Sequence, residues 1–479
     1  MSFSMTSRVR RGIALSAVVL ATGGLVLYRA PAAAFPGDSS FVRGPSVLAD
    51  GKNSAAFAGP GVHGMISLSH TKVLSGQDTT VFADVRIVAD ADSRAHERAP
   101  ISLAVVLDTS GSMSGEKIEE ARRSVLRLLA DMRDDDEIAV IRYSDSSEVV
   151  QPLARVGSVR RELSAKVAQL QASGGTNIPS GLQHGLRALD ESARGRVRRI
   201  VLVSDGLDST RAQAENLARS SFSSGITVSS LGVGLDFDES YMGSLAQNGH
   251  GNFAFVKDGA SLAKFLHREL EETASTTIEN ARVRLQLPEG MRLVSATGAD
   301  AVVHGNEIEL SVGSLFAGDE RRVVVELSAA AYRGMGSTFD IEASASWNQV
   351  GGSSFTTRAP RLSLVATADA SEVDRGKDGA VLASATSVVA SQRQIEAANA
   401  YASGDVTRAA QIAEKNEQAL AAAMVAAPAP AATSLDTQMK AYRSMRKGFA
   451  TVSPKSAEGR AAAKEATVKD MGNMNRSTF

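Results

Sequence analysis

The sequence predicts an α/β domain with a parallel sheet, inserted into an antiparallel β-sandwich and followed by a C-terminal helical segment. Between residues 99 and 275, apolar strand-like runs alternate with helix-like segments, which is typical of a parallel sheet covered on both faces. On either side of this region, apolar and polar residues alternate one by one, as in antiparallel strands. The chain of 479 residues is long enough for roughly three domains of about 150 residues each.

The composition excludes several classes of protein. The chain is 43% hydrophobic and 22% charged, which is ordinary for a globular protein. It has 52 Lys and Arg against 53 Asp and Glu, and this balance does not favour nucleic acid as a partner. Cysteine is absent, which excludes disulfides, thiolate catalysis, a thiolate zinc site and a lipid-modified N-terminal cysteine.

Residues 1–34 have the order of a secretory signal or an N-terminal membrane anchor. Three arginines precede an uncharged stretch over 12–28, and a small-residue exit follows at Ala32–Ala34. Cleavage near Ala34 and retention as an anchor are both open, with a buried helix of a cytosolic domain as the alternative. We expect an exported protein: periplasmic, cell-surface or inner-membrane-anchored and facing outward. The membrane would be contacted only through this segment, if it stays uncleaved.

The flanking β-structure is predicted in two pieces that are separate in sequence. Residues 35–61, rich in Gly, Pro, Ser and Ala, are expected to be a linker. Residues 62–98 alternate around a turn at Gly76 and Asp78 and predict a β-hairpin, which cannot bury its apolar face alone. Residues 276–370 alternate in the same way and predict the rest of a β-sandwich. The α/β domain would then be an insertion between the two pieces.

The chain becomes helical and alanine-rich after the predicted sandwich. Residues 379–450 predict two helices with a break at Gly404 and Asp405, followed by a short linker and one more helix. Residues 454–479 are polar and are expected to be a mobile tail. Acidic residues interleave with the lysines of this tail, so it does not predict a nucleic-acid patch.

Oxygen-bearing side chains gather in three loops of the α/β region. The apolar run 101–107 ends in Asp108, and Ser110 and Ser112 follow; Asp205 follows the strand-like run 200–204. Thr176 comes after two glycines and opens the next helix. Ligand sites of parallel sheets lie at the carboxyl ends of the strands, so we expect these oxygens at one edge. They are hard donors that suit Mg²⁺, and two carboxylates would neutralise it, leaving a site that attracts an incoming carboxylate.

These residues resemble the metal-ion-dependent adhesion site of von Willebrand factor type A domains, which have a Rossmann-like fold. The resemblance covers residues 99–275 and rests on Asp108-Thr-Ser110-Gly-Ser112, then Thr176, then Asp205-Gly206. It implies Mg²⁺, with Mn²⁺ or Ca²⁺ as alternatives, bound by Asp108, Ser110 and Ser112. Thr176 and Asp205 would ligate directly or through water. The wider layout resembles bacterial secreted or membrane-anchored type A proteins and, more distantly, inter-alpha-trypsin inhibitor heavy chains.

The predicted function is a non-enzymatic, metal-dependent adhesion module that captures an Asp or Glu of a protein partner. One alternative is a phosphatase-like hydrolase that uses the same oxygens, although hydrolytic sites usually add a general base and none is evident beside these loops. A second alternative is an envelope scaffold in which the metal only stabilises the fold. Taken singly, each of the three motifs could also be a helix cap or a turn.

Four other features have structural interpretations. Arg133–Glu137 could be a second cation site but better fits a solvated turn. Asp236 and Asp238 lie in a loop that leads into a helix, with Asp238 or Ser240 near its cap, and His267 lacks the second histidine of a zinc motif. Trp347 is on the apolar face of a strand and is expected in the core.

Overall fold

The computed structural model describes residues 52–91, 98–193, 195–205, 208–256, 259–330 and 337–476. These residues belong to the unit that runs from Asp50 to Phe479. The predicted signal or anchor over 1–34 lies outside them. Within the described ranges, no helix is both long enough and apolar enough to cross a membrane.

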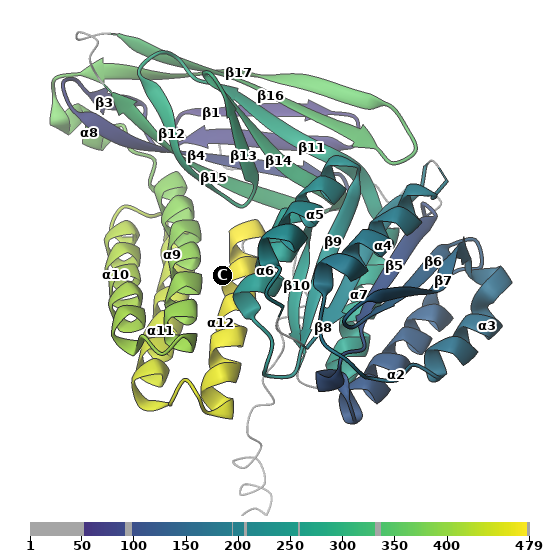
Figure 1. Ribbon diagram of the computed structural model, residues 1–479. Helices are drawn as coiled ribbons and strands as arrows, with labels where there is room; N and C mark the ends of the chain where they lie inside the picture. Colours follow the sequence, from purple (N-terminus) through teal and green to yellow (C-terminus); the bar gives the residue numbers. More distant parts are fainter. Residues whose placement is uncertain are drawn as a thin grey trace, which may run out of the picture. The chain divides into compact units, whose positions relative to one another are not determined.

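The α/β domain is built on a sheet with strand order β10-β9-β8-β5-β6-β7 (Figure 1). Its strands are β5 (Ile101–Asp108), β6 (Glu137–Tyr143), β7 (Ser147–Arg155), β8 (Val197–Ser204), β9 (Ile226–Val233) and β10 (His250–Val256). Neighbouring strands are parallel except β6 and β7, which are antiparallel. The sequence predicts β5, β6, β8 and β9. It misses β7 and β10 because both lie at sheet edges and are largely half exposed, which weakens the apolar signal.

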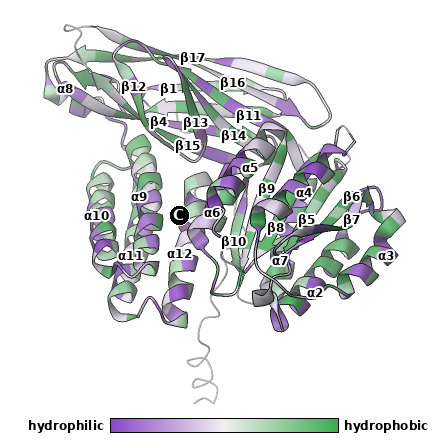
Figure 2. Ribbon diagram, viewed as in Figure 1, coloured by the Kyte–Doolittle hydropathy of each residue, from purple (hydrophilic) through white to green (hydrophobic). Residues whose placement is uncertain are grey.

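Helices cover both faces of this sheet, as the predicted strand–helix alternation requires. Successive residues of β5 point to opposite faces, so Leu103 and Val105 join one apolar cluster and Ala104 and Val106 another. Helices α2 (Glu116–Asp131), α3 (Val156–Ala168) and α7 (Gly259–Ala274) pack on the first face, and α4 (Ile178–Asp190), α5 (Arg211–Ser223) and α6 (Glu239–Asn248) on the second. Figure 2 shows hydrophobic and hydrophilic residues along α2 and α4, as expected of helices with one buried face.

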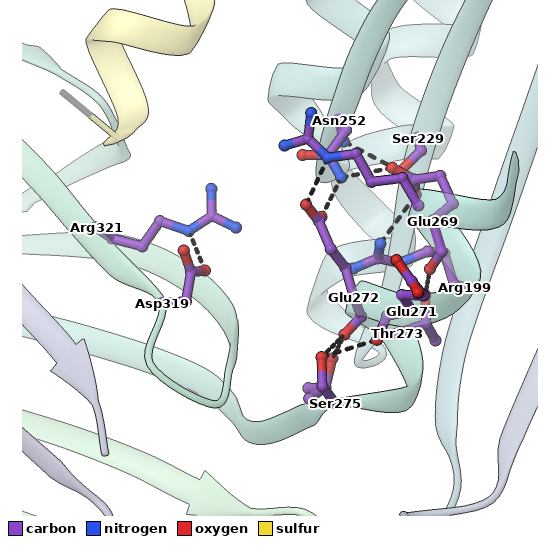
Figure 3. A network of polar contacts seen from close by, with 12 residues as sticks. Arg199, Ser229, Asn252, Glu269, Glu271, Glu272, Thr273, Ser275, Asp319 and Arg321 are labelled. Carbon is purple, nitrogen blue, oxygen red and sulfur yellow. Dashed lines mark hydrogen bonds and ion pairs between the residues drawn. The ribbon is translucent and has the colours of Figure 1, made fainter. Parts of the chain in front are cut away.

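A buried ion pair fastens helix α7 to the sheet (Figure 3). The Glu269 carboxylate accepts hydrogen bonds from Arg199 Nη1 at 2.9 Å and from Ser229 Oγ at 2.6 Å. The Asn252 amide donates to Glu269 and, at 2.7 Å, to Glu272 Oε2. Three strands therefore hold one helix through polar contacts that are shielded from water.

Two further sheets enclose a single hydrophobic core, and the α/β domain is inserted between β4 and β11. Their strand orders are β1-β2-β4-β15-β12 and β13-β14-β11-β16-β17-β3. The strands are β1 (Ser54–Gly59), β2 (Val62–Leu68), β3 (Lys72–Leu74), β4 (Asp78–Ala89), β11 (Thr276–Gln286), β12 (Met291–Thr297), β13 (Asp300–His304), β14 (Glu307–Phe316), β15 (Glu320–Ala330), β16 (Thr338–Gln349) and β17 (Ser354–Thr367). Trp347 is buried in this core, and its Nε1 donates to Pro60 O at 3.1 Å.

The structure corrects two details of the predicted β-region. The expected linker over 35–61 contains β1, which pairs with β2 and buries Ala55 and Phe57. The expected hairpin of β2 and β4 is interrupted by β3, which crosses to the other sheet and pairs in parallel with β17. Short strands such as β3 carry too few residues for their alternation to be recognised.

Within the described residues, five helices follow β17, and the last of them lies where the mobile tail was expected. They are α8 (Ala370–Arg375), α9 (Gly379–Ala402), α10 (Val406–Met424), α11 (Ala429–Thr451) and α12 (Ala457–Arg476). The predicted break at Gly404 is present, and Asp405 caps α10 by accepting from Arg408 N at 3.0 Å. The prediction of a mobile tail was wrong over 454–476, because α12 packs against α9, β15, β10 and α6; residues 477–479 lie outside the described residues. Its polar residues find buried partners there instead of solvent.

The buried carboxyl of Asp470 on α12 is expected to make stability depend on pH. Burial raises its pKa from 3.8 to about 7, while Tyr442 OH donates to its Oδ1 at 2.5 Å. Between these two pKa values the folded chain holds a proton that the unfolded chain has lost. The contribution of Asp470 to the free energy of unfolding is therefore complete below pH 4. It declines as pH rises towards 7, by a few kcal/mol (on the order of 1.4 per pKa unit).

Asp470→Asn tests this expectation because the amide keeps an acceptor for Tyr442 but cannot ionise. Burial also raises the pKa of Glu279 to about 7. The pH dependence of stability that comes from Glu279 is therefore the same in the wild type and in the variant. Denaturant unfolding at a series of pH values should show a shallower decline between pH 4 and 7 in the variant. Equal slopes in the two proteins would contradict the assignment to Asp470.

Candidate metal centre

The fold places the predicted oxygen ligands at the carboxyl edge of the α/β sheet. Strands β5 and β8 are neighbours, with Leu107 opposite Val203. The residues that follow, Asp108 on one strand and Ser204 and Asp205 on the other, therefore lie side by side. Ser204 Oγ donates to Asp108 Oδ2 at 2.6 Å across this boundary.

Four of the predicted ligands form one hydrogen-bonded chain. Ser110 N donates to Asp108 Oδ1 at 2.8 Å, which turns the backbone just after β5. The Ser110 and Ser112 hydroxyls share a hydrogen bond of 3.0 Å, and Ser112 Oγ donates to Asp205 Oδ1 at 2.7 Å. The structure thus brings together Asp108, Ser110, Ser112 and Asp205, as the sequence predicts.

Backbone contacts place the loop of Thr176 beside the first loop. Ser173 N donates to Thr109 O at 2.7 Å, and Gly111 N donates to Gly174 O at 2.9 Å. Thr176, the fifth predicted ligand, follows in this loop and is half-buried. These contacts fix where its loop lies, while the position of its hydroxyl toward the other oxygens stays a prediction.

The two glycines that precede Thr176 are required by a close approach. Gly174 has a φ of 81°, in the left-handed region that favours glycine. A Cβ at Gly174 would collide with the carboxylate of Asp145, and a Cβ at Gly175 would lie 2.6 Å from the same group. The pair therefore lets Asp145 and the Thr176 loop approach each other at the rim of the site.

The electrostatics of the site favour a cation. Asp108 and Asp205 are 0% and 1% exposed, and burial raises the pKa of Asp108, with the nearby Asp205 charge adding to the effect. Lys117 makes an ion pair with Asp205. Two buried carboxylates with one lysine leave a negative charge that a divalent ion would offset.

The donor set also fits a hard divalent cation chemically. All predicted ligand atoms are carboxylate or hydroxyl oxygens, which Mg²⁺, Mn²⁺ and Ca²⁺ accept. Among the residues that the structure describes, no group of three or more His, Cys, Asp or Glu side chains is arranged to hold a metal. A metal bound at this edge would therefore depend on the hydroxyls for part of its coordination.

Sequence reasoning missed three residues of this site. Ser204 donates a hydrogen bond to Asp108, and its position just before Asp205 is the feature of the sequence that could have indicated it. Asp208 accepts from Ile178 N at 2.8 Å, which ties the start of α4 to the loop after β8. Lys117, in the first turn of α2, gave no signal because its contact with Asp205 arises only in the folded chain.

The acidic run Arg133–Glu137 is a turn but is only partly solvated. Asp136 is buried and accepts hydrogen bonds from Arg98 Nη2 at 2.9 Å and from Arg133 N at 2.8 Å. Its charge is matched by Arg98, so this part of the expectation of a solvated turn was wrong. Of the two predicted caps of α6, Asp238 and Ser240, the structure has Asp238, which accepts from Tyr241 N at 2.9 Å. His267 lies beside Asp131 and Glu271 on the surface.

The fold places oxygen-rich loops at the carboxyl edge of a parallel sheet, which is the edge where α/β proteins commonly bind ligands. The chain contains a von Willebrand factor type A domain: residues 102–268 match the model of that family. The family predicted from the three motifs is therefore confirmed.

Curated relatives match about half of this chain or less. The uncharacterized protein YfbK of Escherichia coli is 27% identical over 252 residues, which is 50% of this chain and 44% of that protein. An uncharacterized Synechocystis protein is 25% identical over 258 residues, covering 51% of this chain and 61% of the relative. Human inter-alpha-trypsin inhibitor heavy chain H4 is 28% identical over 37% of this chain and 20% of its own length. The matches thus span less than two thirds of these relatives.

Solved structures share the fold over most of the chain. A von Willebrand factor type A protein from Catenulispora acidiphila aligns with a TM-score of 0.65 and 17% identity, over 88% of this chain and 97% of its own. The ArnB paralog VWA2 from Sulfolobus acidocaldarius aligns with a TM-score of 0.57 and 16% identity, over 88% and 99%. The likeness of fold therefore extends beyond the α/β domain.

Proposed function

We propose that this protein is a metal-dependent binding module that captures a carboxylate of a protein partner. Type A domains are often metal-dependent protein-interaction modules. The observation that carries the proposal is the chain of hydrogen bonds from Asp108 through Ser110 and Ser112 to Asp205, at the sheet edge where ligands bind. Its two carboxylates are buried and Lys117 offsets one of the two charges, so a bound cation would stabilise the other.

Each predicted ligand has a proposed role in this site. Asp108, Ser110 and Ser112 would hold the ion, and Thr176 and Asp205 would hold it directly or through water. Mg²⁺ is the favoured ion, with Mn²⁺ or Ca²⁺ as alternatives, and when bound it supplies a position for an oxygen of the partner's Asp or Glu. The hydroxyl ligands add no negative charge, so the site would still attract that carboxylate.

The proposed location is outside the cytoplasm, at the cell envelope. It is supported by the arginines, the uncharged stretch and the alanine-rich exit within residues 1–34. The predicted ligands Asp108, Ser110, Ser112, Thr176 and Asp205 would bind the metal and the partner, with no catalytic role for any of them.

The test is a calorimetric titration of Mg²⁺ into the purified protein and into the Asp108→Ala, Asp205→Ala double variant. We expect the wild type to bind and the double variant to lose more than about 100-fold in affinity, because both charged ligands are gone. The matched control is Asp134→Ala, Asp135→Ala, which removes two exposed acids from the same domain and should bind like the wild type.

Further measurements on the same proteins separate the proposed function from its alternatives. Acetate or an Asp-containing peptide should raise the affinity for Mg²⁺, since it completes the coordination of the ion. Mg²⁺-dependent hydrolysis of a phosphate ester, lost in the double variant, would instead indicate a phosphatase. A rise in melting temperature with Mg²⁺, but no effect of the peptide, would indicate a structural metal.

A further inference from the structure

A lysine side chain at the proposed metal site contacts a carboxylate oxygen that a bound metal would use. Lys117 Nζ donates to Asp205 Oδ2 and, at 3.3 Å, to the backbone carbonyl of Ser112. The other oxygen of Asp205 accepts from Ser112 Oγ. Two of the five predicted ligand residues therefore contact this ammonium, directly through a carboxylate or through the backbone.

The fold holds Lys117 at this position. The residue lies in the first turn of α2, which begins just after the loop of Ser110 and Ser112. Its side chain is 28% exposed, while the carboxylate it contacts is buried. The loop after β9 closes over its end, because a Cβ at Gly234 would lie 3.2 Å from Lys117 Cε and 3.4 Å from Nζ. The lysine is thus packed from a third segment of the chain.

An ammonium and a divalent cation compete for the same carboxylate. Both cations would draw on the negative charge of Asp205, and two positive charges a few ångströms apart repel each other. Binding of a metal must therefore break the Lys117–Asp205 contact or tolerate the repulsion. Either effect weakens the affinity of the site for the metal.

We propose that Lys117 is a built-in competitor of the metal, which raises the metal concentration that the site requires. This inference rests on the proposed function and concerns the regulation of that site. Lys117 would also couple the binding of the metal to the binding of the partner. Once Lys117 leaves Asp205, its positive charge adds to the attraction for an acidic side chain at the rim, so partner and metal favour each other's binding.

The test compares Mg²⁺ affinity by calorimetry in the wild type, Lys117→Met and Lys117→Arg. We expect Lys117→Met to bind about tenfold more tightly and Lys117→Arg to stay within about threefold of the wild type, because arginine keeps the charge. Lys166→Met is the matched control: it removes a half-exposed lysine that contacts Glu162 and Gln151 in the same domain, and it should leave the affinity unchanged. Electron paramagnetic resonance of free Mn²⁺ gives a second readout of occupancy.

The outcomes distinguish failure of this inference from failure of the proposed function. Equal or weaker binding by Lys117→Met, with normal binding by the wild type, would overturn the role of Lys117 and leave the metal site standing. No binding by any of these proteins would overturn the proposed function itself. If Lys117→Met does not fold, Lys117→Gln removes the charge while its amide can still donate to Asp205, and the same tighter binding is expected.

Discussion

Replacing Glu269 by alanine is expected to lower the free energy of unfolding of the α/β domain by about 3–5 kcal/mol. The carboxylate is buried and pairs with the buried guanidinium of Arg199. Its removal leaves that charge without a counter-ion, and the remaining bond from Arg199 Nε to Thr227 Oγ1 at 3.1 Å does not neutralise it. The lost side chain also leaves a cavity between α7 and the sheet, which adds to the cost.

Denaturant unfolding followed by far-ultraviolet circular dichroism measures this loss. Fluorescence is unsuitable because the single tryptophan, Trp347, lies in the core of the two flanking sheets. Glu271→Ala on the same helix is the matched control, since Glu271 is 68% exposed and should change stability by at most about 0.5 kcal/mol. A loss in Glu269→Ala no larger than in this control would contradict the prediction.

A double variant separates the value of the ion pair from the cost of an unpaired charge. Arg199→Met with Glu269→Leu removes both charges and fills the space with apolar groups. It should lose clearly less stability than Glu269→Ala alone, because a buried ion pair is often no better than apolar packing.

Replacing Lys464 by alanine is expected to release α12 from the α/β domain. Its Nζ donates to Glu239 Oε2 at 2.6 Å and to Phe237 O at 2.7 Å, and it lies 4.0 Å from the centre of the Phe237 ring. Both charged groups are buried, so the alanine variant leaves Glu239 without its counter-ion at a cost of about 3 kcal/mol or more. The backbone amides of α12 should then exchange hydrogen about 100-fold faster.

Hydrogen exchange followed by mass spectrometry checks this result segment by segment. Lys440→Ala on α11 is the control, because Lys440 is exposed and its ion pair is with Asp436 on its own helix. Lys464→Met with Glu239→Gln should recover much of the protection, since no unpaired charge remains. Unchanged exchange of α12 in Lys464→Ala would show that its other contacts hold it without the ion pair.

The α/β domain and most of its site follow from rules that act locally in the sequence. The apolar run before Asp108 predicts a strand, and the strand–helix alternation predicts neighbours that run parallel. Neighbouring parallel strands end at the same edge of the sheet. The proximity of Asp108 and Asp205 can therefore be predicted without knowing how the side chains pack. Edge strands such as β7 escape prediction because partial exposure blurs their period.

By itself, the sequence determined the type A domain, the helices over 379–450, and the gathering of Asp108, Ser110, Ser112 and Asp205 at one edge. The tertiary structure alone decided that Lys117 lies on Asp205 and that Lys464 pairs with Glu239. The physical reason is the same for both lysines. A charged side chain looks like solvated surface in a sequence, because its hydration in the unfolded chain is favourable. Burial becomes favourable only when folding brings a carboxylate from a distant segment to the same place.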